Sequence, residues 1–337
     1  MTDGQTPASR VRGMLNGYVE TQLLYVAAAL GLADALHAGA LDIDALVGAT
    51  GADRDSLHRV MRGLANIGIV IEGEDGRFAL TETGQLLRSD MPGSLRTLAL
   101  LTGEQEYRAW GELLYTVRTG QTAFDHVYGE PFFARLDRDR STSAHFNAFM
   151  DHVSARIAAA LLRAYDFSAV RTVVDVGGGR GTLLTALLAA HPHLRGVLFD
   201  RPAVSREAEA ALAAAELAGR RRFIAGDFFT SVPEGGDLYI LSQVLHDWDD
   251  EQCRRILSNC RRAMGPEGKL LIVERLLPER VVPPTPVVTS DLHMLTLTGG
   301  RERAEAEYVT LLAGSGFALA RVIPLVAGWS LIEGALE

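Results

Sequence analysis

The chain has 337 residues, of which 47% are hydrophobic, so it is long enough for two domains that each bury a core. Its net charge of -9 disfavours a nucleic-acid partner, because Lys and Arg supply most of the affinity for phosphates. A small-molecule partner fits this charge better. No apolar run is long enough to cross a bilayer and residues 1–12 are polar, so we expect a cytoplasmic protein.

Residues 1–93 are expected to form an α-rich winged-helix domain. Apolar residues recur at helical spacing from Val19 to Ala33, and the runs at 69–71 and 78–80 flank an Asp-Gly turn, which predicts a hairpin. A winged helix can bind DNA, or it can serve packing and dimerisation. Residues 1–100 contain twelve Asp and Glu against eight Arg, and this acidity favours dimerisation.

Two further regions follow. Residues 94–165 are expected to be a helical linker whose scattered aromatic residues contribute to a substrate pocket. In residues 166–337 strands alternate with helices, a pattern typical of a doubly wound, mostly parallel sheet. The last two expected strands, 318–324 and 329–333, are joined by a short turn and could form an antiparallel hairpin at one end of the sheet.

A glycine-rich turn follows the first of these strands, at residues 172–176. The glycines Gly177, Gly179 and Gly181 fit the pattern G-x-G-x-G, whereas the third glycine of a dinucleotide fingerprint would fall at Thr182. The next strand ends on Asp200, where a ribose diol would lie. A ligand with a ribose and no phosphate, S-adenosylmethionine (SAM), therefore fits better than NAD.

The second cofactor signal is the segment Gly226-Asp227-Phe228. Asp227 could accept a hydrogen bond from the adenine amino group, and Phe228 could lie against the adenine ring. A lone glycine-rich turn is often only a tight connection between a strand and a helix. The two later acids, which follow it in the right order, favour the cofactor site over that simpler interpretation.

Three residues carry the expected chemistry. His246 follows the fourth strand and Glu274 ends the next, so both lie at the edge of the sheet where ligands of open α/β folds bind. Glu302 is expected to open another helix. A histidine can take a proton from a phenol, and a carboxylate beside it would hold its tautomer. Alternatively, His246 is a capping or core histidine and Glu274 a solvated strand end.

Taken together, the motifs resemble the SAM-dependent O-methyltransferases of the caffeate type, including their bacterial natural-product relatives. The resemblance covers essentially the whole chain and rests on five segments: Asp175–Gly181, Gly226–Phe228, His246–Trp248, Glu274 and Gly299–Arg303. It implies a Rossmann-like SAM-binding domain and a homodimer. Methyl transfer from SAM requires no metal, and the sequence has no His/Asp cluster with convincing metal-ligand spacing. The implied reaction is methyl transfer to a hydroxyl, expected to be phenolic, of an aromatic or polyketide-like secondary metabolite, as in antibiotic biosynthesis.

The resemblance also assigns roles to residues. It implies that His246 is the general base, flanked by Glu274 and Glu302. The SAM contacts that it implies come from Asp175, Gly177, Gly178, Gly179, Asp200, Arg201, Gly226, Asp227, Phe228, Ser242 and Ser154. The substrate contacts that it implies come from Trp110, Phe146, Met150, Asp247, His293 and Met294.

This sequence departs from the plant enzymes at two of these positions. They usually carry Lys where Ser242 stands. His293 replaces a usually apolar residue, so it either binds a substrate oxygen or is a satisfied buried histidine.

Other functions stay open from the sequence. The chain could be a SAM-binding relative that catalyses hydroxylation or pericyclic chemistry instead of methylation. A DNA-binding regulator that uses the winged helix is a further alternative, and an NAD-dependent oxidoreductase is disfavoured by the missing third glycine.

Overall fold

The computed structural model describes residues 6–214, 217 and 219–337, and it divides the chain into two compact units. One unit contains the residues up to Arg108 together with Ala144–Phe149, and the other contains Ala109–Ser143 together with Met150–Glu337. Among the described residues, no helix has both the length and the apolar character that a membrane span requires. The domain boundaries expected from the sequence stay predictions.

The first unit consists of short helices and a two-stranded hairpin. Asp42, Asp53 and Thr81 begin helices by accepting hydrogen bonds from backbone N–H groups in the first turn, as capping residues do. The elements are α1 (Pro7–Leu15), α2 (Gly17–Ala29), α3 (Leu32–Ala35), α4 (Ile43–Thr50), α5 (Arg54–Asn66), β1 (Val70–Glu72), β2 (Phe78–Leu80), α6 (Glu82–Gln85), α7 (Arg96–Leu101) and a π-helix (Thr102–Glu106). The expected hairpin is confirmed, with β1 and β2 antiparallel.

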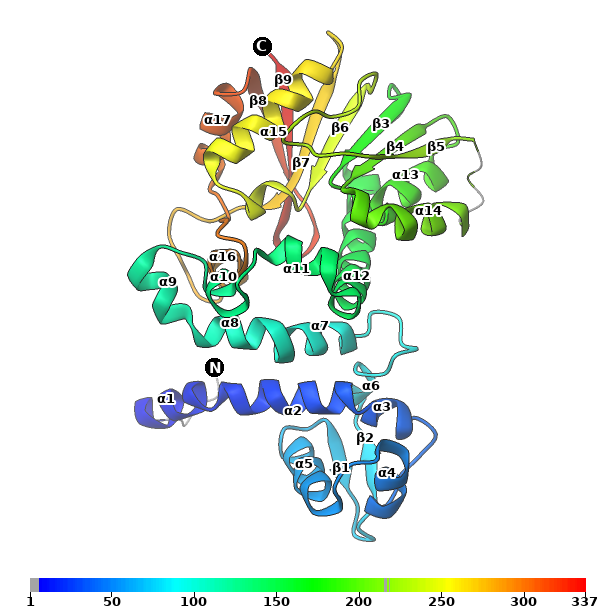
Figure 1. The fold of residues 1–337 in the computed structure, drawn as a ribbon, viewed down its shortest axis with the longest axis vertical. Coiled ribbons are helices and arrows are strands. Elements are labelled where there is room, and N and C mark those ends of the chain that lie inside the picture. Colours follow the sequence, from blue (N-terminus) through cyan, green and yellow to red (C-terminus); the bar gives the residue numbers. More distant parts are fainter. Residues whose placement is uncertain (1–5, 215–216, 218) are drawn as a thin grey trace. The chain divides into compact units, whose positions relative to one another are not determined.

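The second unit is built on a seven-stranded sheet in the order β5-β4-β3-β6-β7-β9-β8 (Figure 1). The strands are β3 (Thr172–Val176), β4 (Arg195–Asp200), β5 (Arg221–Ala225), β6 (Leu238–Ser242), β7 (Lys269–Arg275), β8 (Phe317–Pro324) and β9 (Trp329–Leu336). Strands β3 to β7 pair in parallel, and β9 pairs antiparallel with both β7 and β8. The expected parallel sheet and its terminal hairpin are therefore confirmed.

Helices cover both faces of this sheet. On one face lie α15 (Asp250–Ala263) and α17 (Glu305–Ala313), and on the other lie α12 (Arg140–Ala164), which passes through both units, α13 (Thr182–Ala190) and α14 (Ser205–Ala214). The other helices are α8 (Tyr107–Gly111), which begins in the first unit, α9 (Leu113–Thr119), α10 (Ala123–Tyr128), α11 (Phe132–Arg138) and α16 (Pro286–Leu297). Short 3₁₀ turns lie at 202–204, 245–247 and 326–328.

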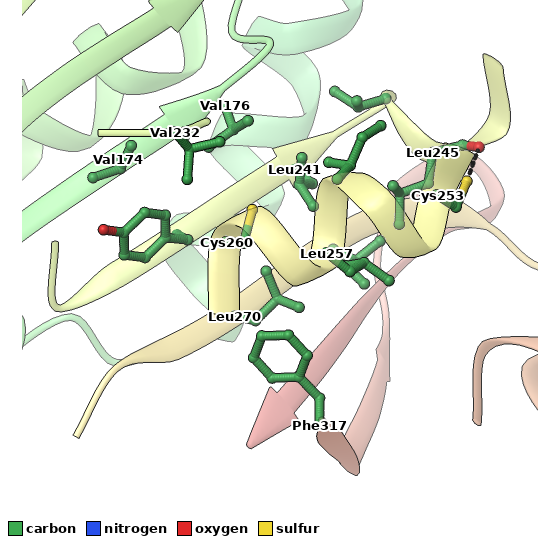
Figure 2. Close-up of a cluster of buried hydrophobic side chains, with 14 of the residues drawn as sticks. Val174, Val176, Val232, Leu241, Leu245, Cys253, Leu257, Cys260, Leu270 and Phe317 are labelled. Atoms are coloured by element: carbon green, nitrogen blue, oxygen red, sulfur yellow. Dashed lines mark hydrogen bonds between the residues drawn. The ribbon is translucent and has the colours of Figure 1, made fainter. Parts of the chain in front are cut away.

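Successive residues of each strand point to opposite faces, so the sheet supports two separate cores. Val174 and Leu241 pack with α15, whereas their neighbours Val173 and Ile240 belong to the other core. Figure 2 shows the first core, in which Leu257 and Cys260 of α15 pack with the strands and Cys253 donates to the Leu245 carbonyl after β6. Both cysteines are buried and free.

One expected element is wrong. Glu302 does not open a helix, because α17 begins three residues later at Glu305. The backbone before that point is extended, and Arg303 forms an isolated parallel bridge with Leu276, just beyond β7. Glu302 is therefore held by an extended segment beside the sheet.

We predict that Leu257→Ala lowers the free energy of unfolding by roughly 2–5 kcal/mol, since it leaves a cavity in a fully buried part of the core. Urea denaturation would measure this loss. Val309→Ala on α17 is the control, because Val309 is 43% exposed and its truncation should change stability by about 0.5 kcal/mol or less. Equal losses in the two variants would contradict the packing described.

Candidate active site

The glycine-rich turn connects the carboxyl end of β3 to α13. Gly177, Gly179 and Gly181 all have positive φ, at 73°, 59° and 81°, a conformation that favours glycine. A Cβ on Gly177 would also lie only 2.8 Å from the Val244 side chain. Helix α13 then starts at Thr182, so the turn presents bare backbone and a helix N-terminus at the same edge of the sheet.

Two carboxyl groups lie beside this turn, at the ends of the adjacent strands β3 and β4. Asp175 is buried, and burial together with the charge of Asp200 raises its pKa to about 7. Its Oδ2 atom has no hydrogen-bond partner among the described residues. The Asp200 carboxylate accepts hydrogen bonds from the backbone N–H groups of Gly179 and Arg201, both at 2.7 Å. The pair offers acceptor atoms to a ligand held over the turn.

The remaining predicted cofactor residues differ in their surroundings. Ser242 ends β6, and its buried hydroxyl has no partner among the described side chains. The Phe228 ring lies 3.6 Å from the position of a Gly177 Cβ, and Gly226 packs directly on Phe199. Asp227 is exposed and already accepts hydrogen bonds from Phe229 and Thr230, so its role toward adenine stays a prediction.

A contact between α12 and the glycine turn is not among those predicted from the sequence. Asp151 accepts a hydrogen bond from the Thr182 hydroxyl at 2.5 Å and forms an ion pair with Arg180. The arginine inside a glycine-rich turn was the available signal, since a partly buried cation needs a carboxylate partner. Ser154 is half-buried, one turn further along α12. Gly178 lies within the same turn, where a Cβ would be 2.5 Å from the Asp175 carboxyl.

Arg201 is directed toward α11. Its guanidinium forms an ion pair with Asp137, donates to the Phe133 carbonyl at 3.2 Å and lies 5.0 Å from the centre of the Phe133 ring. That ring stacks on Trp248 with 5.7 Å between centroids. The aromatic wall formed by Phe133 and Trp248 was also not predicted from the sequence.

The backbone that carries His246 is held on one side by Glu274. After β6 the chain turns sharply, with Gln243 at a φ of 58°, and enters the 3₁₀ turn at 245–247. Glu274 is completely buried, and its Oε1 accepts the N–H groups of Val244, Leu245 and His246 at 3.0, 2.9 and 3.4 Å. One carboxylate oxygen therefore satisfies three consecutive amides of the turn.

Arg303 holds the opposite side of the same turn. Its guanidinium is only 1% exposed and donates to the carbonyls of Leu245 and Trp248 at 2.9 and 2.8 Å and to Asp250 at 2.9 Å. The N–H of Arg301 donates to the His246 carbonyl at 2.8 Å. The sequence identifies Arg303 as part of the Gly299–Arg303 motif but does not predict its partners, because they lie more than fifty residues earlier.

The imidazole of His246 lies among carboxyl groups. Its Nδ1 is 2.9 Å from Glu274 Oε2 and 3.6 Å from Glu302 Oε1, while its Nε2 is 3.9 Å from Asp247 Oδ1. Carboxylates beside Nδ1 favour a proton on that nitrogen, so we assign Nε2 as the acceptor in the neutral ring. The structure thus brings together the three residues that the sequence singled out.

Burial and charge set the protonation of this cluster. Burial lowers the pKa of His246, but Glu274 and Asp247 outweigh it and raise that pKa well above 6.5. Burial also raises the pKa of Asp247, to about 7, against the opposing charge of His246. For Glu302 burial acts in the same direction, yet the hydrogen bond and charge of His246 lower its pKa overall.

The structure divides the predicted substrate residues between its two units: Phe146 belongs to the first unit and the others to the second. Trp110 donates its indole N–H to His293 Nδ1 at 3.2 Å, and both side chains are half-buried. Met294 follows on α16 and Met150 lies on α12, also half-buried. Phe146 lies in the segment of α12 that belongs to the first unit. Substrate contact by any of them stays a prediction.

Two family models match the chain. An O-methyltransferase domain matches residues 110–318, and an O-methyltransferase dimerisation domain matches residues 13–90. The phenazine O-methyltransferase PhzM of Lysobacter antibioticus is 46% identical over 331 residues, which cover 98% of this chain and 97% of that protein.

Solved structures show the same likeness. The crystal structure of LaPhzM is 45% identical with a TM-score of 0.95, covering 99% of this chain and 100% of that one. An O-methyltransferase from neocarzinostatin biosynthesis, NcsB1, was solved with S-adenosyl-L-homocysteine and 1,4-dihydroxy-2-naphthoic acid. It is 35% identical with a TM-score of 0.83, covering 94% of this chain and 96% of that one.

Gly300 packs against the 3₁₀ turn that carries His246. A Cβ at this position would lie 2.0 Å from the His246 carbonyl oxygen, so Gly300→Ala must displace the turn. We expect a loss of turnover of about 100-fold, the size associated with misplacing a reacting group by roughly 1 Å. Gly265→Ala is the matched control, because nothing lies within 4 Å of its added Cβ. Normal turnover in Gly300→Ala would contradict the described geometry.

Proposed function

The chain belongs to the SAM-dependent O-methyltransferase family, and we propose that it methylates a phenolic hydroxyl of a flat, polycyclic aromatic metabolite. The family, fold class and cofactor expected from the sequence are confirmed. The choice of acceptor is supported by the names of two relatives, which refer to a phenazine and to a dihydroxynaphthoic acid. It is also supported by the half-buried Trp110 and the stacked pair Phe133 and Trp248.

The residues around the glycine turn fit SAM. The unpartnered buried oxygens of Asp175 and Ser242 and the bare backbone at Gly177 suit a ligand with amine and hydroxyl donors. We assign Asp200 to the ribose hydroxyls and Phe228 to the adenine ring. Bound SAM supplies a methyl group on a sulfonium, which is already a strong electrophile.

We assign His246 as the general base, and the carboxylates around its Nδ1 are the observation that carries this assignment. With SAM bound, Nε2 would accept the proton of the acceptor hydroxyl. The oxygen would take the methyl group as the S–CH3 bond breaks, and S-adenosylhomocysteine would leave. Glu274 Oε2, at 2.9 Å, and Glu302 then stabilise the imidazolium that forms. The protein's remaining task is to align the acceptor oxygen with the methyl group.

The first unit supports a homodimer. Five apolar side chains of α1 and α2 are largely exposed: Val11, Met14, Leu15, Tyr18 and Val19. Because an apolar face of this kind usually marks an interaction site, and the dimerisation model covers most of it, we infer that a second copy packs there. Catalysis without metal, the absence of a nucleic-acid partner and a cytoplasmic location stay predictions.

His246→Ala should reduce methyl transfer by at least about 100-fold and leave SAM binding unchanged, because the variant lacks only the proton acceptor. Release of S-adenosylhomocysteine across a panel of phenols, hydroxynaphthoates and hydroxyphenazines measures the first quantity, and calorimetry measures the second. His126→Ala, an exposed histidine stacked on Tyr115, is the control. Undiminished turnover in His246→Ala would exclude the base assignment.

The pH dependence follows from the raised pKa of His246. Only the neutral ring accepts a proton, so kcat/KM should rise with pH and reach half its maximum above pH 6.5. Protonated His246 stabilises the fold at low pH, and this contribution is lost as the pH rises through the folded-state pKa. A rate profile from about pH 5.5 to 10, with an acceptor whose own titration lies outside this range, tests the first point. A midpoint below 6.5 would contradict it.

A further inference from the structure

Arg275 is a partly buried cation for which the mechanism so far has no use. It ends β7, one residue after Glu274, and its guanidinium lies 4.1 Å from the centre of the Trp329 ring on β9. Its Nη1 donates to the hydroxyl of Ser290 on α16 at 2.9 Å. Burial lowers the pKa of Arg275, against the opposing charges of Glu302 and Glu274. A guanidinium held in such a place needs a negative partner.

Ser290 links that cation to the active site. Its hydroxyl donates to Glu302 Oε1 at 2.6 Å, and the same oxygen lies 3.6 Å from His246 Nδ1. The direction of these two hydrogen bonds follows from which groups can donate and which can accept. Arginine can only donate, so Ser290 Oγ accepts from Arg275 and keeps its own proton for Glu302. Burial raises the pKa of Glu302, but the hydrogen bond and charge of His246 lower that pKa overall, which makes the Glu302 oxygen the acceptor. The arrangement therefore favours Glu302 as a carboxylate aimed at the imidazole.

The charges around His246 show what this cation offsets. Three carboxyl groups surround the ring, those of Glu274, Glu302 and Asp247. Groups on other elements that are electrostatically coupled to this cluster include Arg275 on β7, Arg201 after β4, Cys253 on α15, Asp291 on α16 and Tyr308 on α17. Arg303 donates to Asp250 and to backbone carbonyls, whereas Arg275 reaches Glu302 through one hydroxyl.

We propose that Arg275, acting through the Ser290 hydroxyl, is a positioning residue for the base. Through this hydroxyl it orients the Glu302 carboxylate toward His246 Nδ1, and its charge offsets the carboxyl groups around the ring. The proposal rests on the assignment of His246 as the base. Its consequence has a definite sign, because removal of a nearby cation favours the imidazolium and His246 then stays protonated to higher pH.

Four single variants test this link from Arg275 through Ser290 to Glu302, which we call the relay. Arg275→Met removes the charge and keeps an apolar side chain over Trp329, and Ser290→Ala removes the bridging hydroxyl. Ser290→Thr restores the hydroxyl. Arg321→Met is the matched control, since Arg321 also lies over an aromatic ring of the same unit and pairs with Glu333 on β9, away from His246.

The first readout does not depend on turnover. Titration of the His246 imidazole by NMR in the ligand-free protein, assigned by comparison with His246→Ala, gives its midpoint directly. We expect this midpoint to rise by about half a pH unit or more in Arg275→Met, which loses the cation. In Ser290→Ala the cation stays and the Glu302 carboxylate loses its hydroxyl donor, so we expect the midpoint to fall. The acid limb of the kcat/KM profile should move with the His246 midpoint. In Arg275→Met this shift lowers the rate at a given pH on that limb roughly threefold. Ser290→Thr and Arg321→Met should match the original protein.

Three outcomes decide the proposal. An unshifted midpoint in Arg275→Met, with turnover that still requires His246, overturns the relay and leaves the base assignment intact. A loss of turnover without movement of the acid limb overturns it as well, because that loss indicates a purely structural role. Full turnover in His246→Ala overturns the base assignment, and with it this proposal, whatever the NMR midpoint shows.

Discussion

The active site depends on one buried carboxylate, that of Glu274. One of its oxygens accepts three consecutive backbone N–H groups, and the other faces the imidazole of His246 at 2.9 Å. The same residue therefore fixes the path of the chain after β6 and the orientation of the ring that this chain carries. A fully buried carboxylate is costly unless its oxygens have partners, and here the turn supplies them. The turn and the carboxylate stabilise each other.

This arrangement is possible because of the strand order. Strands β3, β6 and β7 are neighbours in the sheet, so the glycine turn, His246 and Glu274 all follow strands that end side by side. The strand order reverses at β3, because β4 and β5 follow on one side of it and β6 and β7 on the other. Open α/β sheets bind their ligands at such a point. Val244 lies so close to Gly177 that no side chain fits there, which places the cofactor turn and the turn of the base in direct contact.

The sequence predicts the residues that local pattern can place. Asp175, Asp200, His246 and Glu274 each follow an apolar run of strand length, and parallel pairing then brings them to one edge. Glu302 was assigned to the right cluster and the wrong element, because a Gly-Gly segment followed by charged residues resembles the start of a helix. The groups that bond to the side chains of Arg303, Arg275 and Asp151 lie 15 to 58 residues away, and no local periodicity encodes these contacts.

The accumulation of acids around His246, the general base that we propose, involves a compromise. Carboxylates that stabilise the imidazolium make His246 a stronger proton acceptor, which favours the transfer step, and the same carboxylates reduce the fraction of neutral imidazole at a given pH. A general base works best when its pKa lies near the working pH. Glu274 cannot be removed to achieve this, because it also holds the backbone of the turn. The remaining adjustment is to add positive charge at the edge of the cluster, and Arg275 lies there, linked to Glu302 by a single hydroxyl.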